Sequence, residues 1–406
     1  MSGRDPDETH RAATPLELLY DLTFVVAFGV AAAELAHLLV EGHVVAGLLS
    51  FVFVMFTACW AWVNFNWFAS AYDTDDWAYR LLVMAQMVGV IILALGIPPV
   101  FASVDTGEHV DNRLMIAGYV VMRIAMVALW IRAARQDPDH RAVCLIRAVT
   151  ISVAQIGWIG VFIVQASLPV TFLLAALMMA VEMAGPWLVE RRGGGSRWHA
   201  HHIAERYGLL TIITLGEGVV GTVASLSAEV TAQGGWTVGA VLVGVAGMGL
   251  TFGMWWIYFA VPSSVLLHAD RSTAIQLNYT HIPVFCSIVA TGAGLHAAAY
   301  YIDHHSALGR VGTVLAVAIP VGLFIGSIFL LYALLVDDWD RFHTLLLTLS
   351  AVILAGAVAL AAAHVSMAVC LLVITLAPIV NIVGFEAVGH RHTVEAVRRR
   401  IDGAAH

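Results

Sequence analysis

The sequence has little charge and no lysine, and these two scarcities exclude several classes of protein. Charged residues make up only 12% of the chain, hydrophobic residues make up 60%, and the mean hydropathy is +0.85. Soluble domains carry about 25% charged residues. We therefore expect a polytopic membrane protein whose surroundings are the lipid bilayer. All twenty basic residues are arginines, and no basic tract among them suggests a nucleic-acid partner.

Cysteine is also scarce. The four cysteines stand singly in different apolar segments, and no pair has the CxxC spacing. Isolated cysteines of this kind are usually small packing residues. We expect neither a disulfide nor a metal site from them, and no cofactor. The four are Cys59, Cys144, Cys286 and Cys370.

Long apolar runs dominate what is present. A helix needs roughly 20 residues to cross about 30 Å of hydrocarbon, and twelve segments are long enough to do so. The sequence therefore predicts an all-α integral membrane protein with about twelve transmembrane helices. The expected boundaries are 16–40, 45–69, 79–102, 114–132, 143–166, 169–189, 204–226, 237–260, 277–301, 310–335, 343–362 and 365–387.

Arginine placement predicts the orientation, because short loops rich in positive charge stay in the cytoplasm. Counted over alternate connections from the N-terminus, seventeen arginines fall on one side and only Arg113 and Arg310 on the other. Both termini are therefore expected in the cytoplasm, which agrees with an even number of spans.

A basic, glycine-rich stretch, ERRGGGSRWHAHH, separates two halves of six spans each. Sliding the second half by 188 residues matches Glu205 to Glu17, as expected for parallel repeats related by an axis along the membrane normal. The predicted organisation is a cytoplasmic tail (1–14), a first half (15–189), a cytoplasmic linker (190–202), a second half (203–387) and a cytoplasmic basic tail (388–406).

The first predicted span carries several ionisable groups. Thr14 and Glu17 have the spacing of a capping box, so Glu17 is interpreted first as a helix starter. Asp21 is the seventh residue of the predicted helix, about 9 Å from its start, beyond the reach of the first-turn dipole, and needs another partner. Glu34 and His37 lie one turn apart near the far end, where they form either an exposed interfacial pair or the mouth of a pathway.

Glu217 is the strongest single candidate. It lies thirteen residues into the predicted seventh span, where a carboxylate costs at least roughly 2.5 to 3.5 kcal/mol. Glycines at 216, 218 and 221 surround it. One interpretation is a helix crossing sealed by a hydrogen-bonded acid. The favoured one is a locally opened helix at a substrate or proton site.

Other charged and imidazole groups lie in or near the spans. Arg123 and Glu182 have opposite charges, and a structural ion pair is expected for them. His199, His201 and His202 follow a glycine-rich run and are expected in a solvated segment rather than in a metal site. Four groups could extend a proton relay, although a lone histidine in a span is more often simply hydrogen-bonded. These four are His281, His296, His364 and Glu386.

An acidic turn after the second span suggests a different chemistry. Asp73, Asp75 and Asp76 form a DxDD-like cluster below several aromatic residues. The simpler interpretation is a helix-ending turn with an interfacial aromatic belt. Alternatively, the three aspartates are catalytic: they hold Mg²⁺ on a diphosphate or protonate an alkene in a membrane-embedded enzyme acting on an isoprenoid. The pocket would be lined by Trp60, Trp62 and Trp67.

Four motifs recur together along about the first 260 residues: ELLYDLTFVVAF (17–28), YDTDD (72–76) with the following Arg80, HIAERYGLLTIITLGEGVV (202–220) and WWIYF (255–259). In combination they resemble the bacterial low temperature requirement protein A family. The resemblance implies a polytopic protein of the bacterial cytoplasmic (inner) membrane, associated by name with growth in the cold, and no established substrate. Leu19 and Tyr20 stand where the family has an aromatic pair, and Ala260 stands where it has an acid.

The leading functional hypothesis is a secondary transporter or ion-coupled carrier of a small molecule or ion, with Asp21 and Glu217 in a central cavity and Glu217 as the protonation site. The membrane enzyme is the alternative, and a non-catalytic sensor or assembly factor has no positive support in the sequence. The substrate, the coupling ion and the oligomeric state do not follow from the sequence. The candidate pathway residues are Asp21, Glu217, Glu17, Glu34, Glu205, Arg123 and Glu182.

Overall fold

The fold is built from helices. The computed structural model describes residues 3–5, 8, 11–107, 109–191, 198–269, 273–336 and 341–389. Across these residues the only extended pairing is an isolated β-bridge between His109 and Ser167. Twelve helical segments are long and apolar enough to cross a membrane, which confirms the predicted fold class. Three parts of the predicted organisation lie outside the described residues: much of the N-terminal tail, residues 192–197 of the linker and residues 390–406 of the basic tail.

The helices form two compact units, one of Met1–Ala31 with Val52–Arg206 and one of Ala32–Phe51 with Tyr207–His406. Helices α1 and α2 each contribute residues to both units. The units therefore do not coincide with the two halves expected from the sequence, and the repeat stays a prediction.

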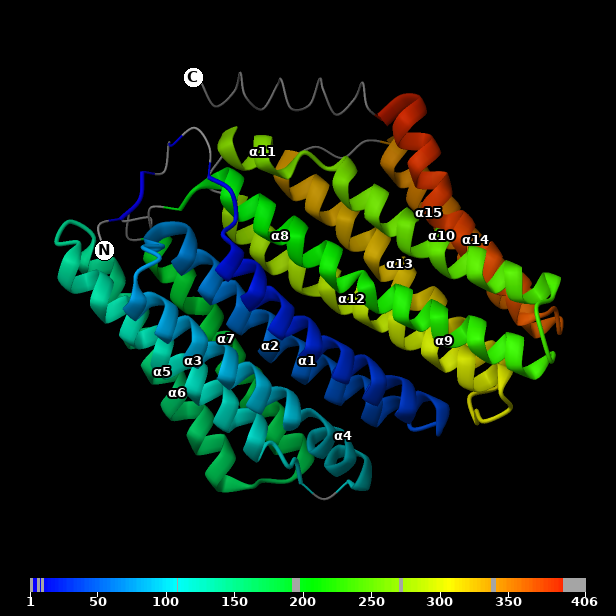
Figure 1. Ribbon diagram of the computed structural model, residues 1–406, viewed down its shortest axis with the longest axis horizontal. Helices are drawn as coiled ribbons and strands as arrows, with labels where there is room; N and C mark the ends of the chain where they lie inside the picture. The colour runs from blue at the N-terminus through cyan, green and yellow to red at the C-terminus, as the bar shows by residue number, and fades with distance from the viewer. Residues whose placement is uncertain are drawn as a thin grey trace. The chain divides into compact units, whose positions relative to one another are not determined.

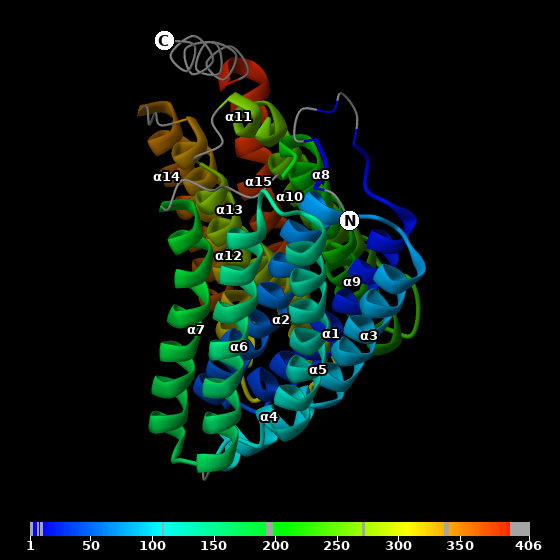
Figure 2. The ribbon, with the colours of Figure 1, turned by 90° about the vertical axis from the view of Figure 1, so that its left-hand side faces the viewer.

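In the first unit the helices pack as a chain of neighbours. Helix α3 packs on α5, α5 on α6, and α6 on α7, and Figure 2 shows α5, α6 and α7 side by side. The helices with most of their residues here are α1 (Pro15–Val40), α2 (Val44–Tyr72), α3 (Trp77–Leu95), α4 (Ile97–Thr106), α5 (Arg113–Gln136), α6 (Arg141–Val164) and α7 (Leu168–Arg191), followed by the start of α8 (Ala200–Thr214).

In the second unit α12 is the central helix. It packs on both α9 and α13, as Figure 1 shows, and 78% of its span is buried. Helix α10 packs on α9 and α15, and α14 packs on α13 and α15. The elements are α9 (Gly216–Ala232), α10 (Val238–Ala260), α11 (Ser263–Ala269), α12 (Ala274–Ile302), α13 (Gly309–Val336), α14 (Arg341–Ala362), α15 (Met367–Gly384) and the π-helix η2 (Phe385–Gly389).

Two of the predicted spans are interrupted. The third divides into α3 and α4 at Gly96, because Pro98 and Pro99 follow and cannot donate backbone hydrogen bonds. A Cβ at Gly96 would collide with the backbone of Met115, so glycine is required where α5 passes. The seventh span divides into α8 and α9 at Leu215, whereas the eighth, expected at 237–260, is the unbroken helix α10, with the short helix α11 after it.

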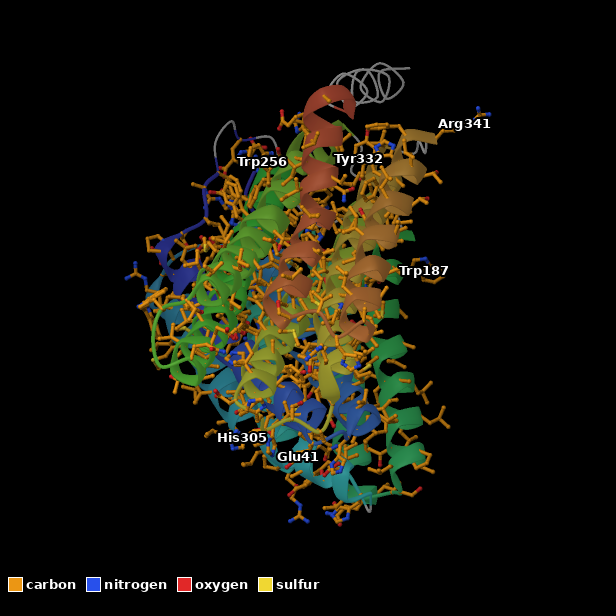
Figure 3. The ribbon with its side chains drawn as sticks, turned by 90° about the vertical axis from the view of Figure 1, so that its right-hand side faces the viewer. Glu41, Trp187, Trp256, His305, Tyr332 and Arg341 are labelled. Carbon is orange, nitrogen blue, oxygen red and sulfur yellow. The ribbon has the colours of Figure 1, made fainter. Side chains whose placement is uncertain are left out.

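The outer faces of the helices are apolar. In the first unit Ile156 and Leu173 are 71% and 70% exposed, and Figure 3 shows Trp187 pointing away from α7. A water-soluble protein rarely exposes contiguous apolar surface on this scale, whereas lipid accepts it. The surface therefore supports the membrane assignment made from composition.

Candidate functional site

Helix α1 begins with a capping box. The Glu17 backbone N–H donates to Thr14 Oγ1 at 3.3 Å, and the Thr14 N–H donates to Glu17 Oε2 at 2.7 Å. These bonds satisfy two donors that a helix start leaves without intrahelical partners. They also fix the Glu17 carboxylate at the start of the span.

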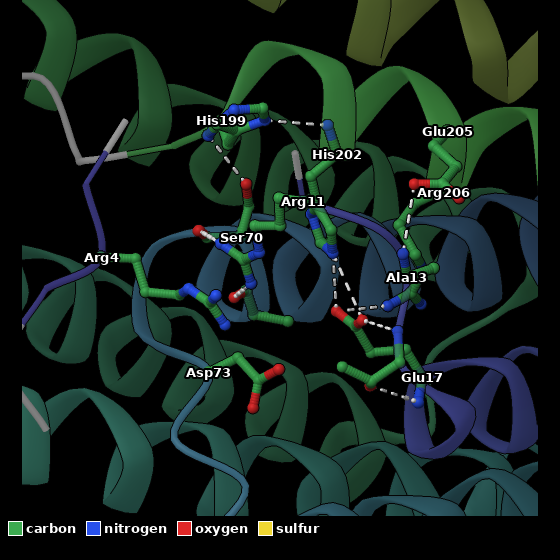
Figure 4. Close-up of polar contacts among 12 residues, drawn as sticks. Arg4, Arg11, Ala13, Glu17, Ser70, Asp73, His199, His202, Glu205 and Arg206 are labelled. Carbon is green, nitrogen blue, oxygen red and sulfur yellow. Dashed lines mark hydrogen bonds and ion pairs between the residues drawn. The ribbon is translucent and has the colours of Figure 1, made fainter. Parts of the chain in front are cut away.

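Glu17, Asp21 and Arg206 form a buried ionic cluster in the first unit, with His202 beside it. Arg206 Nη1 lies 2.8 Å from Glu17 Oε1, and Arg206 Nη2 lies 2.5 Å from Asp21 Oδ1. His202 Nε2 lies 3.1 Å from Glu17 Oε1. All four side chains are fully buried, and Figure 4 shows Glu17 facing His202 and Arg206. One guanidinium therefore binds two carboxylates one helical turn apart.

Trp62 completes the environment of Asp21. Its indole N–H donates to Asp21 Oδ1 at 2.6 Å, and the Arg206 guanidinium lies 5.7 Å from the Trp62 ring centroid. Hydrogen bonds from charged or aromatic donors offset the cost of burying a carboxylate. The partner that Asp21 requires is thus Arg206, supported by Trp62. Because removing one partner of a buried ion pair is strongly destabilising, we interpret Glu17, Asp21, Arg206 and His202 as a structural anchor, called the ionic anchor below.

The segment before α1 is tied to the end of α2. The Arg11 guanidinium donates to the carbonyls of Ala69 and Ser70, which lie in the last turn of α2, where carbonyls lack a full set of intrahelical donors. Ser70 Oγ accepts from the His199 backbone N–H at 3.0 Å. Burial, with the nearby charge of Arg4, lowers the pKa of Arg11. Arg11 therefore links the N-terminal segment to α2, and Ser70 links α2 to the residue before α8.

The start of α8 corrects one sequence prediction. His199 Nδ1 accepts from the His202 backbone N–H at 3.2 Å, so its Nε2 carries the proton donated to the Glu8 carbonyl at 2.8 Å. His199 is thus the N-cap of α8. The expectation of a solvated segment is wrong for His199 and His202, which are buried, and fits only the exposed His201. The reason is that the helix begins immediately after the glycine-rich run.

Glu217 has the opposite character. It lies near the middle of the 33-residue span Ala200–Ala232, in the first turn of α9 and two residues after the interruption at Leu215. The residue is only 9% exposed. Within the described part of the chain, no hydrogen bond or ion pair reaches its carboxylate, which experiences only desolvation.

Glycines bring neighbouring helices close to Glu217. A Cβ at Gly292 on α12 would lie 2.9 Å from both the Cβ and the carbonyl oxygen of Glu217. A Cβ at Gly218 would lie 2.5 Å from Thr251 Oγ1 on α10. Both approaches are closer than a side chain permits, so α9 packs backbone-first here. The backbone and Cβ of Glu217 therefore pack against neighbouring helices rather than against loops.

Two further polar groups near Glu217 have no partner among the described residues. The Thr214 hydroxyl is fully buried without a hydrogen bond, three residues before Glu217. His296 lies one turn after Gly292 on α12, is half-buried and makes no hydrogen bond to described residues. Buried polar groups are nearly always satisfied in folded proteins. Thr214, at the end of α8, and His296, on α12, thus add two unbonded polar groups to the region of Glu217, whereas each charged group of the ionic cluster has an ion-pair partner.

The sequence comparisons place the chain in a family. The model of the bacterial low temperature requirement A protein (LtrA) family matches residues 12–378. The chain belongs to the LtrA family. Comparison with curated proteins and with solved structures gives no match. The matched region of this LtrA protein contains both the ionic anchor and Glu217.

The DxDD-like turn of this LtrA protein is occupied by structural bonds. Asp73 Oδ1 accepts from the Asp75 N–H at 3.0 Å, and Asp75 pairs with Arg80 at 2.7 Å. Asp76 Oδ1 caps α3 by accepting from the Tyr79 N–H at 2.9 Å. The hydrogen bond from Arg80 lowers the pKa of Asp75. Because the three carboxylates are bonded to groups of the protein itself, the turn does not favour the membrane-enzyme alternative.

Asp76 provides a stability test in this turn. Besides capping α3 it binds Arg132 through both oxygens, and that bond lowers its pKa. Asp76→Ala should lower the free energy of unfolding by about 1 to 2 kcal/mol, because it removes both a cap and an ion pair. Asp76→Asn should cost less than about 1 kcal/mol, since asparagine also caps helices. Unfolding of the purified protein in detergent measures both.

The pH dependence of the free energy of unfolding tests the same pair, Asp76 and Arg132. A carboxyl with a lowered folded-state pKa contributes stability above its unfolded pKa of about 3.9, and loses that contribution as the pH falls. The wild type should therefore lose its advantage over Asp76→Asn in acid. Equal losses for the alanine and asparagine variants would contradict the capping role.

A second buried ion pair lies between α5 and α7 of the LtrA protein. Arg123 Nη2 lies 2.8 Å from Glu182 Oε2. The hydroxyl of Tyr119 and the indole N–H of Trp158 donate to the same carboxylate at 2.7 and 2.8 Å. Arg123 and Glu182 are therefore held in a structural pair, as opposite charges in a bundle should be.

The remaining candidates lie apart from these groups. Glu205 accepts from the Ala13 N–H at 3.1 Å. Glu34 is half-buried, and His37 pairs with Glu41 at 3.5 Å rather than with Glu34. Neither arrangement resembles the enclosed carboxylate of Glu217.

Sequence reasoning missed Arg206 and His202 as partners of the first-span acids. A signal was present: the two are four residues apart and therefore share one face of α8. An arginine inside an apolar helix needs an acid, but the identity of that acid depends on a contact across 185 residues of sequence. Gly292 and Thr214 carried no signal of their own.

Proposed function

We propose that this LtrA protein is a proton-coupled secondary transporter, in which Glu217 binds and releases the coupling proton. The observation that supports the proposal is a carboxylate enclosed in the middle of a span without a hydrogen-bond or ion-pair partner. An acid in that position is stable when protonated, and it ionises when water reaches it. A carrier that alternately encloses and opens such a group couples proton movement to its conformation.

The interruption between α8 and α9 supplies a hinge for this exchange. Backbone that is not continuously helical inside a membrane normally lines a cavity or is buried in protein. Here the break at Leu215 immediately precedes Glu217. Movement of α9 relative to α8 would change the exposure of Glu217 without disturbing the ionic anchor, whose α8 members, His202 and Arg206, precede the break.

The anchor has a supporting role in this proposal. Asp21 is bound by Arg206 and Trp62, so it is held in place rather than free to exchange a proton. We assign Glu17 and Asp21 to the fixed part of the carrier. The arginine distribution further supports insertion in the inner membrane with both termini in the cytoplasm.

Proteoliposomes containing a trapped pH-sensitive dye test the proposal. We expect at least one class of solute in a panel of amino acids, sugars, organic cations and organic anions to drive internal pH changes that protein-free liposomes do not show. Purified protein that elutes as a single folded species, yet moves no protons with any solute in the panel, would contradict the proposal.

A further inference from the structure

The second unit contains a cavity that the proposed proton site does not use. It has a volume of about 560 Å³ with its mouth included. The ends of α10, α13 and α15 and the start of α14 line it. Small-molecule sites are typically concave, with mostly apolar walls and a few polar groups.

The walls of the cavity are largely aromatic. Phe329 and Tyr332 are buried and belong to its floor, and Phe342, Phe385 and Trp256 are half-buried and surround its mouth. Figure 3 shows Trp256 and Tyr332 toward the same end of the second unit. Such walls favour an apolar ligand body, because aromatic side chains supply large contact area at low entropic cost.

One polar group in the floor has a vacant acceptor. Asn381 is only 4% exposed. Its amide nitrogen donates to Ser350 Oγ and to the Ala377 carbonyl, each at 2.7 Å. Its Oδ1 has no hydrogen-bond partner among the described residues.

The orientation of this amide is determined by its neighbours. The Ala377 carbonyl can only accept, so it must face the NH₂ group. Ser350 Oγ donates its own hydrogen to the Leu346 carbonyl at 2.9 Å and can only accept from Asn381. A flipped amide would place its oxygen against two acceptors. Asn381 Oδ1 is therefore a fixed acceptor, buried at the edge of an apolar cavity.

We propose that this cavity binds a lipid-soluble alcohol, whose hydroxyl donates to Asn381 Oδ1 and whose apolar body packs on the aromatic walls. A donor is required because the vacant group is an acceptor. An uncharged donor suits the site because the lining includes no carboxylate to pair with a cation and no arginine or lysine to pair with an anion. An apolar body suits the cavity, since only such a body gains from contact with Phe329 and Tyr332.

The mouth carries a second contact that orders it. The Trp256 indole N–H donates to Glu386 Oε1 at 3.2 Å and joins α10 to η2. Both residues come from elements that line the cavity or adjoin it. The proposed site thus has a closed floor at Asn381 and a bonded rim at Trp256, and it does not depend on the role of Glu217.

Photoaffinity labelling of the full-length protein in lipid nanodiscs tests this site. The probe is a long-chain alcohol with a diazirine in its chain, and the competitors are decanol and decyl methyl ether. We expect saturable labelling of peptides that contain Trp256 or Tyr332. Decanol should compete about tenfold better than its ether, because only the alcohol donates a hydrogen bond.

A matched pair of variants isolates the acceptor. Asn381→Leu should weaken decanol competition about tenfold and remove its advantage over the ether. The control is Asn64→Leu, which removes a half-buried asparagine of the first unit bonded to the Trp60 carbonyl. It should change neither the strength of decanol competition nor the advantage of decanol over the ether. If Asn381→Leu does not fold, the comparison of alcohol and ether on the wild type still decides. Equal competition by decanol and its ether would overturn the proposal. Labelling that does not saturate would also overturn it, because it would mean that the cavity holds water and does not bind the probe.

Discussion

Replacing Arg206 by leucine is expected to destabilise the protein far more than Asp76→Ala does. Arg206 is fully buried and binds both Glu17 and Asp21. Removing it leaves two carboxylates in a dry interior without their cation. Breaking one buried ion pair costs about 3 to 5 kcal/mol, and whole domains are stable by only about 5 to 15 kcal/mol. We expect little folded protein, measured as the monodisperse fraction after extraction and as the unfolding midpoint in detergent.

A compensated variant separates charge from packing. Arg206→Leu combined with Glu17→Gln and Asp21→Asn removes the uncompensated charges while keeping both side-chain shapes. Glutamine preserves the capping box, and asparagine still accepts from Trp62. This triple variant should recover most of the lost stability, because neutral side chains of similar volume replace buried ion pairs at little cost. A triple variant as unstable as Arg206→Leu would mean that the charges do not form the anchor.

Substituting Glu217 by glutamine should abolish accumulation while leaving exchange. Glutamine is close in shape to protonated glutamate but cannot ionise, so the carrier would move solute without a proton. Proton-driven accumulation of the solute found in the proteoliposome screen should fall to the protein-free level. Exchange of labelled for unlabelled solute at equal pH should stay within about threefold of the wild type. Such a change is smaller than the factor of ten that corresponds to about 1.4 kcal/mol.

Glu229 supplies the matched control on the same helix. It is half-buried near the end of α9, and Glu229→Gln should leave both accumulation and exchange at wild-type levels. Loss of accumulation in both variants would indicate damage to α9 rather than loss of a proton site. Full accumulation in Glu217→Gln would contradict the assignment of Glu217.

The helices could be predicted because one local property decides them. The spans expected at 16–40 and 310–335 correspond to α1 (Pro15–Val40) and α13 (Gly309–Val336), since apolar length alone determines what can cross a bilayer. The interruptions were harder to predict. Pro98 and Pro99 explain the break in the third span, whereas the break at Leu215 is followed by glycine, which also occurs within unbroken helices.

The partners of the buried acids could not be predicted in the same way. The sequence showed that Asp21 needs a partner, but hydrophobic periodicity says nothing about which residue 185 positions away supplies it. The histidine cluster was misjudged for a related reason. Composition suggested a solvated loop, and the cap that His199 forms on α8 depends on where the helix begins. Glu217 was identified because a mid-span acid is costly wherever its neighbours lie.

The central claim is that Glu217 holds a proton while it is enclosed. Infrared difference spectroscopy of reconstituted protein measures this directly, through the carbonyl stretch of a protonated carboxylic acid. We predict a band at neutral pH that shifts in deuterated water and is missing from Glu217→Gln but present in Glu229→Gln. Identical spectra for the wild type and Glu217→Gln in this region would contradict the account.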